Sequence, residues 1–98
     1  MNLLVAIPAG WAHEHGEALI RGACRAAHLM GMEHIHLVAT ADDLPDLAIH
    51  AAAHSAELPS GFQLCQRGAC AVFTEQHSVL IDAPFLLRLG RVRGLVEV

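Results

Sequence analysis

The chain has 98 residues, 54% of them hydrophobic and 16% charged, which suits one compact domain (residues 1–98) and excludes a disordered chain. Its net charge is −4 and all six basic residues are arginines, which argues against an electrostatic nucleic-acid binder. No run approaches the roughly 18 apolar residues that span a bilayer, and the start Met1–Val5 lacks the basic region of a signal peptide. We therefore predict a cytoplasmic protein without membrane association. Its three cysteines, an odd number, suit reduced thiols better than a disulfide framework.

The first part of the chain alternates strand and helix patterns. Residues 3–8 are a continuous apolar run that ends at Pro8, typical of a central strand buried on both faces. From His13 to Met30 apolar residues recur at helical spacing, and Gly31 then supplies a helix stop. His34–Thr40, rich in apolar and β-branched residues, is a predicted second strand.

A second helix and a third strand follow. Asp42 or Asp43 is expected to cap the helix, which runs to about Glu57 with Pro45 in its first turn. Phe62–Cys65 is the predicted third strand. This βαβαβ order implies a parallel sheet with right-handed crossovers.

The rest of the chain extends the same pattern. We expect a helix over Gln66–Gln76, a strand or irregular segment over His77–Ile81, a short helix over Ala83–Leu89 and an edge strand over Leu95–Val98. The predicted fold class is α/β, with a mostly parallel sheet of four or five strands and helices on both faces, in three layers.

An alternative arrangement stays open for the second half of the chain. Phe62–Gln66, Cys70–Thr74 and Ser78–Ile81 could pair as antiparallel strands of an α+β sheet, with Gly68 in a turn. Cys65 would then have no helix terminus beside it.

Cys65 is the best candidate for a reactive group. If a helix begins at Gln66, its unpaired N–H groups and positive dipole end favour a thiolate at Cys65, and Arg67 adds positive charge. The other interpretation, a buried structural cysteine, carries equal weight. Cys24 falls on the apolar stripe of the first helix and is predicted to be core, and Cys70 is either core or a resolving thiol.

Histidines give a second candidate site. His50 and His54 are one helical turn apart, with Glu57 on the same side, a set able to present two imidazoles and a carboxylate to a divalent metal. The alternative is that they are solvated or interface residues. We expect no other cofactor, because the loop 8–12 has a single glycine and no phosphate-binding fingerprint.

The stretch 47–58, followed by residues 61–69, resembles the DsrE/TusD family of sulfur-relay proteins, in which a helix precedes a strand that ends in a cysteine. The resemblance implies a small flavodoxin-like (DsrE-like) domain that carries sulfur as a cysteine persulfide and assembles with related subunits. Cys65 corresponds to the sulfur-carrying cysteine of that family. The implied partners are a sulfur donor and a sulfur acceptor protein.

Two functions are therefore predicted. The first is a persulfide carrier or sulfurtransferase that uses Cys65 and Arg67. The second is a non-catalytic binding or regulatory subunit of the same fold, with His50, His54 and Glu57 as ligands of a divalent metal. The low charge and the Ala-rich second helix predict a homo- or hetero-oligomer in either case.

Overall fold

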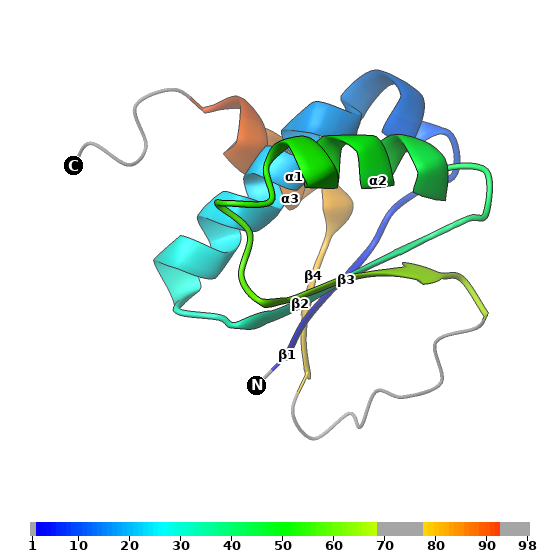
Figure 1. Ribbon diagram of the computed structural model, residues 1–98. Helices are drawn as coiled ribbons and strands as arrows, with labels where there is room; N and C mark the ends of the chain where they lie inside the picture. Colours follow the sequence, from blue (N-terminus) through cyan, green and yellow to red (C-terminus); the bar gives the residue numbers. More distant parts are fainter. Residues whose placement is uncertain (1, 69–77, 93–98) are drawn as a thin grey trace.

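The computed structural model describes residues 2–68 and 78–92, which form four strands and three helices (Figure 1). In chain order they are β1 (Asn2–Ala6), α1 (Trp11–Met30), β2 (His34–Ala39), α2 (Leu44–Ala53), β3 (Gly61–Gln66), β4 (Ser78–Ile81) and α3 (Ala83–Arg91). The strands form one sheet in the order β3-β2-β1-β4, and every neighbouring pair is parallel. The predicted α/β class with a parallel sheet is confirmed.

The two strands of the antiparallel alternative that the structure describes form parallel pairs and lie at opposite ends of the sheet. β3 pairs in parallel with β2, and β4 pairs in parallel with β1. The third strand of that alternative, Cys70–Thr74, lies outside the described residues, as does the predicted edge strand Leu95–Val98.

The predicted helix over Gln66–Gln76 does not begin where the sequence placed it. Gln66 is the last residue of β3, and the ladder continues one residue further, because the Arg67 N–H donates to the Ala39 carbonyl at 2.7 Å. Gly68 then turns the chain with a φ of 87°, a left-handed conformation that favours glycine. The remainder of the predicted helix lies outside the described residues.

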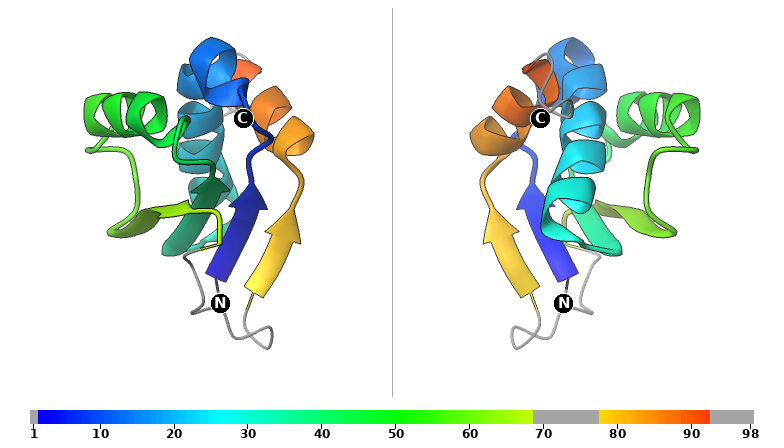
Figure 2. Two further views of the ribbon diagram at one scale, coloured as in Figure 1. Left: turned by 90° about the vertical axis from the view of Figure 1, so that its right-hand side faces the viewer. Right: turned by 90° about the vertical axis from the view of Figure 1, so that its left-hand side faces the viewer.

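In the part of the chain that the structure describes, all three helices lie on one face of the sheet (Figure 2). The crossovers β1-α1-β2 and β2-α2-β3 advance in the same direction, and right-handed crossovers of that kind place their helices on the same face. The third helix joins them by packing on α1. The described helices therefore do not form the predicted layers on both faces.

Alternation along the strands separates the two faces of the sheet. Leu3 and Val5 of β1 and Ile35 and Leu37 of β2 are fully buried and form the core under the helices. The side chains between them belong to the opposite face, which we call the far face. Its described members on the three strands β1 to β3 include Leu4, Ala6, His34, His36, Val38, Gln63 and Cys65.

The helix boundaries follow from local sequence. α1 ends as predicted at Gly31, whose φ is 65° and whose N–H donates to Ala27. α2 ends at Ala53 rather than near Glu57, because His54 leaves the helical conformation at φ −111° and ψ 22°. α3 begins after the N-cap residue Asp82, whose carboxylate accepts a hydrogen bond from the Phe85 N–H at 2.9 Å. Within the described ranges, no helix combines the length and the apolar character needed to cross a membrane.

Two glycines let α1 and α3 cross in backbone contact. A Cβ at Gly90 would collide with the Ala18 carbonyl oxygen of α1, and a Cβ at Gly22 would collide with the Leu86 carbonyl oxygen of α3. Arg25 strengthens the same contact, because its guanidinium donates to the Leu89 carbonyl at 2.7 Å and also to that of Val92. The crossing thus combines close packing with satisfied carbonyls at the end of α3.

Gly90→Ala should destabilise the protein, although alanine normally stabilises a helix interior by about 1 kcal/mol relative to glycine. The added methyl group meets backbone atoms of Ala18 and Gly22, so α3 must shift, at a cost of about 1–3 kcal/mol. Urea denaturation measures the free energy of unfolding. A Gly90→Ala variant as stable as the wild type would contradict the close crossing.

Candidate functional site

Cys65 is the penultimate residue of β3 and lies opposite Val38 of β2. Its neighbour Leu64 is paired with the buried Leu37 on the helix side, so alternation places the Cys65 side chain on the far face. Cys65 is half-buried there. The thiol therefore lies near the carboxyl end of its strand, on a face that none of the described helices covers (Figure 2).

Arg67 lies at the carboxyl edge of the sheet and is anchored to two neighbouring strands. Its N–H bonds the end of β2, and its guanidinium Nη2 donates to the Ile7 carbonyl at 2.8 Å, just beyond β1. A positive charge is thereby held at the edge where α/β proteins place ligands. The described chain offers no helix start at Gln66, so Arg67 is the group that brings positive charge near this end of β3.

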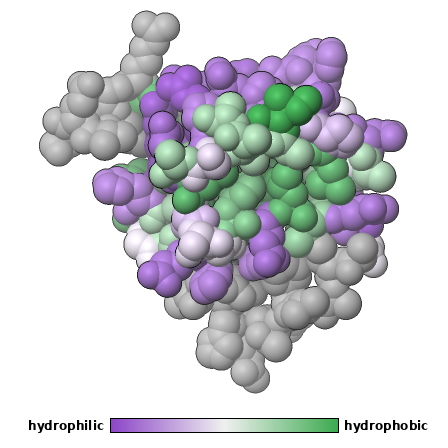
Figure 3. Space-filling model, viewed as in Figure 1, coloured by the Kyte–Doolittle hydropathy of each residue, from purple (hydrophilic) through white to green (hydrophobic). Residues whose placement is uncertain are grey.

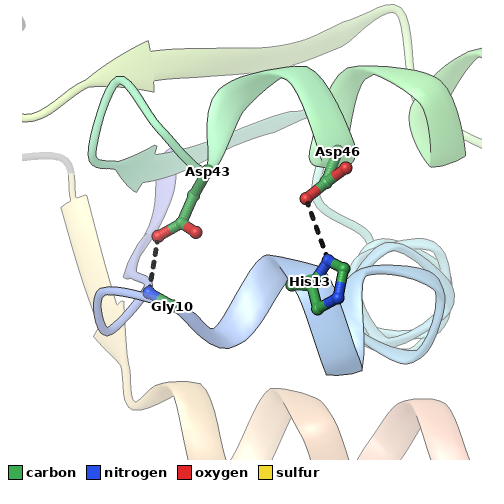
Figure 4. Close-up of polar contacts among 4 residues, drawn as sticks. All are labelled: Gly10, His13, Asp43 and Asp46. Atoms are coloured by element: carbon green, nitrogen blue, oxygen red, sulfur yellow. Dashed lines mark hydrogen bonds and ion pairs between the residues drawn. The ribbon is translucent and has the colours of Figure 1, made fainter.

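Asp43 organises the loops at the same edge, in a role that the sequence did not reveal. We expected it or Asp42 to cap α2, and Asp43 does occupy the N-cap position, but its side chain makes no capping bond. Its carboxylate instead accepts a hydrogen bond of 3.0 Å from the Gly10 N–H (Figure 4) and another of 3.0 Å from the Thr40 hydroxyl. Asp43 is only 4% exposed, so it ties the β1–α1 loop to the β2–α2 loop from within the protein. The sequence indicated that Asp43 would accept a hydrogen bond near the start of α2. It could not indicate that the donor is Gly10, which is 33 residues away.

A weaker polar contact lies beside the hydrogen bonds of Asp43. His13 Nδ1 and Asp46 Oδ2 are 3.9 Å apart, joining α1 to α2 (Figure 4). Both side chains are substantially exposed, and ion pairs of this kind contribute little to stability. The buried Asp43 therefore makes the stronger connection between the two loops.

The structure brings together two of the three predicted metal ligands. His54 Nδ1 lies 3.6 Å from Glu57 Oε2, whereas the His50 ring packs over Gly16 of α1, where a Cβ would come within 2.7 Å of it. The helical spacing assumed for the trio fails because α2 ends at Ala53. Among the residues that the structure describes, no group of three histidine, cysteine or acidic side chains is arranged to hold a metal ion.

A groove of about 510 Å³ runs between α1 and the turn that follows α2. It is lined by Glu17, Arg21, Cys24, Arg25, His28, His54 and Glu57. Burial raises the pKa of Cys24 to about 11, and the nearby Glu57 carboxylate acts in the same direction. Cys24 is therefore a protonated thiol at neutral pH, in agreement with its predicted core position.

Two histidines of β2 share the far face with Cys65. Burial lowers the pKa of His36, a nearby His34 lowers it further, and a hydrogen bond with Gln63 acts in the opposite direction. His36 therefore carries a neutral imidazole at pH 7. Cys65 thus shares its face of the sheet with polar groups from two adjacent strands.

No family model matches the sequence, and no curated protein matches it. Among solved structures, a chain from the crystal structure of the NAD+-reducing NiFe-hydrogenase in the H2-reduced state is similar, with a TM-score of 0.58 and 11% sequence identity. The match covers 91% of this chain but only 24% of the hydrogenase chain. This likeness concerns the fold alone and agrees with the α/β arrangement described above.

Asp43→Ala should lower the free energy of unfolding by about 1.5–3 kcal/mol, the range for hydrogen bonds to a charged group. The substitution leaves the Gly10 N–H and the Thr40 hydroxyl without their acceptor. Chemical denaturation of Asp43→Ala and Asp42→Ala makes a matched comparison, because Asp42 is an exposed neighbour. Equal losses of unfolding free energy in the two variants would show that the hydrogen bonds of Asp43 with Gly10 and Thr40 do not stabilise the protein.

Stability should fall as the pH rises from 9 to 11, through ionisation of Cys24. Its pKa is raised from 9.0 to about 11 in the folded protein, so the folded state holds the thiol proton more tightly than the unfolded state does. The contribution of the Cys24 thiol to the free energy of unfolding is complete below pH 9 and is lost as the pH passes 11. This contribution totals about 2–3 kcal/mol, at 1.36 kcal/mol per pKa unit.

The chain contains no lysine or tyrosine, so few other side chains titrate in this range. Denaturation curves at a series of pH values measure the decline, and Cys24→Ala should flatten it. A decline of the same steepness in Cys24→Ala would assign it to other groups.

Proposed function

We propose that this protein is a small carrier of sulfane sulfur, which it holds as a persulfide on Cys65. The observation that carries the proposal is the contrast between the two described cysteines. Cys65 is half-buried near the carboxyl end of β3, whereas Cys24 is buried and its pKa is raised to about 11. Cys65 is thus the better placed of these two thiols to react.

The sequence adds independent support. Residues 47–69 resemble the DsrE/TusD sulfur-relay family, and Cys65 corresponds to the sulfur-carrying position of that family. The four parallel strands agree with a domain of this class. A flavodoxin-like, three-layer arrangement of the complete chain is part of the proposal.

The proposed transfer needs no external oxidant. The Cys65 thiolate attacks the terminal sulfur of a donor persulfide, a new S–S bond forms on Cys65, and the donor S–S bond breaks. The donor thiolate leaves with the electron pair and takes up the proton that Cys65 released. An acceptor thiolate then attacks the outer sulfur on Cys65 and restores the Cys65 thiolate.

Arg67 has an electrostatic role in this scheme. Its anchored guanidinium places positive charge at the carboxyl edge and favours both the thiolate and the anionic persulfide. A single surface charge pair contributes about 1 kcal/mol or less, equivalent to less than tenfold in reactivity. Arg67 therefore modulates the reactivity of the Cys65 thiol, which is the group that reacts.

The proposed partners are a sulfur donor and a sulfur acceptor protein in the reducing cytoplasm. The second candidate function is a non-catalytic oligomeric subunit with a divalent metal at the histidines. The His54–Glu57 pair, 3.6 Å apart beside the groove, favours it. Elemental analysis of untagged protein that found no stoichiometric metal would remove the metal from this candidate.

Incubation with a small-molecule persulfide donor, followed by intact-mass analysis, tests the carrier. We expect the wild type to gain one sulfur atom, Cys65→Ser to gain none, and both Cys24→Ser and Cys70→Ser to keep the gain. Treatment with a thiol reductant should remove the added sulfur, because the persulfide bond is reducible. The carrier proposal is ruled out by a wild type that gains no sulfur, or by a gain that survives in Cys65→Ser.

A further inference from the structure

The outward side of α2 is an apolar stripe. Its members are all exposed and follow helical spacing, and we call them the α2 stripe: Pro45, Ala48, Ile49, Ala52 and Ala53. Ile49 is 66% exposed, the largest fraction among the exposed large hydrophobic residues of the described chain. The stripe is thus a helix face without a partner in the described monomer.

The side of α2 that faces the protein is mostly apolar, with Asp46 and His50 directed toward α1. Leu47 is fully buried against the core, Ala51 packs beside it, and Asp46 is the only Asp, Glu, Lys or Arg of the helix. A helix with apolar residues on its outward side as well as its inward side is typically covered on both sides. The exposed stripe is therefore a surface that an additional protein layer would cover.

β3 lies below α2 at the edge of the sheet. Among the described residues no strand pairs with its outer side, and its six residues include no charged residue and no proline. Gly61 and Arg67 donate their N–H groups inward, to Glu33 and Ala39, and alternation along the ladder then directs the N–H groups of Leu64 and Gln66 outward. Edge strands usually carry charges, prolines or bulges that prevent pairing, and β3 itself has none of these features.

The stripe and the edge lie on the same side of the molecule. α2 and β3 are side by side at the front of Figure 1 and at the same lateral end of the sheet in Figure 2. The space-filling view of that side shows a continuous apolar region over α2 and the strand below it, with hydrophilic surface around it (Figure 3).

We propose that this side binds a second copy of the same chain, with the two β3 strands antiparallel about a two-fold axis. The axis joins the two four-stranded sheets into one and brings the two α2 stripes together. Residues opposite each other must belong to the same face of the sheet. Pairing Gln63 with Gln63 meets this condition and places Phe62 of one copy opposite Leu64 of the other, beneath the helices.

Charge explains why a second copy fits this surface. From Leu47 to Gln66 the chain has one Asp, Glu, Lys or Arg, which is Glu57. Two molecules that each carry a net charge of −4 repel through most of their surfaces, whereas this surface meets its copy without burying like charges. The two-fold axis also sets the α2 helices antiparallel, so opposite ends of their dipoles are adjacent.

The area of the proposed interface determines how tightly the two copies are expected to bind. A strand of six residues spans about 20 Å, and a sheet with its helix layer is about 20 Å high, so each copy contributes about 400 Å². A stable interface buries about 800 Å² per partner. Since hydrogen bonds from the β3 edge supplement this smaller area, we expect a dimer that dissociates on dilution.

Sedimentation equilibrium of the full chain over a range of concentrations tests the proposal. The wild type should show a monomer–dimer equilibrium, Ile49→Lys should raise the dimer dissociation constant at least about tenfold by placing a charge in the stripe, and Leu29→Lys should leave it unchanged. Leu29 is the matched control, because it is 55% exposed but lies in the last turn of α1, outside the stripe. Both side chains are largely exposed, so neither substitution removes a core contact.

Amide hydrogen exchange supplies a second measurement. In the wild type, exchange at Leu64 and Gln66 should slow as the protein concentration rises, and Ile49→Lys should show no such slowing. The proposal is overturned by a wild type that stays monomeric up to its solubility limit, or by equal dissociation constants for the two lysine variants. Exchange at Leu64 that does not depend on concentration would also overturn it.

Discussion

The close crossing of α1 and α3 is the contact on which the rest of the architecture depends. Because Gly22 and Gly90 have no Cβ, the two helix backbones touch, and Arg25 holds the carbonyls at the end of α3. This crossing places α3 on the same face of the sheet as α1 and positions β4, which leads directly into α3, beside β1. This helix pair thereby determines the place of β4 in the sheet and the face that α3 covers.

The carboxyl edge of the sheet has a comparable organising contact in Asp43. Its carboxylate joins the loops after β1 and β2, and the Arg67 guanidinium bonds the Ile7 carbonyl between them. These contacts link the first three strands at the edge nearest to Cys65. A fixed edge keeps the Cys65 thiol and the Arg67 guanidinium in a constant relation, as the proposed carrier function requires.

Much of this fold could be predicted from local sequence. The apolar runs of β1 and β2, the helical spacing of α1 with Gly31 as its end, and Pro45 in the first turn of α2 all appear as the pattern indicated. These features depend on neighbours within a few residues. The end of β3 was misjudged because Gln66 is held in the sheet by its pairing with Ala39 of β2, a partner that is remote in sequence.

The candidate site was less predictable because its contacts also depend on partners that are remote in sequence. The three metal ligands proposed from sequence assumed that α2 continues past His54, but it ends at Ala53, and His50 packs on Gly16 instead. Asp43 was expected to cap its own helix and instead bonds Gly10, 33 residues away. Side chains whose partners come from another element can be placed only when the packing of those elements is known.

The pairing of β1 with β4 has a consequence for how the chain folds. Asn2 lies opposite Ser78, so these neighbours in the sheet are separated by 76 residues, whereas β1, α1 and β2 form a continuous local unit. Closing so long a loop adds little to the free-energy cost of folding, which rises only with the logarithm of loop length, but non-local pairing slows folding. We therefore expect the βαβαβ unit of the first 66 residues to form before β4 and α3 join the sheet.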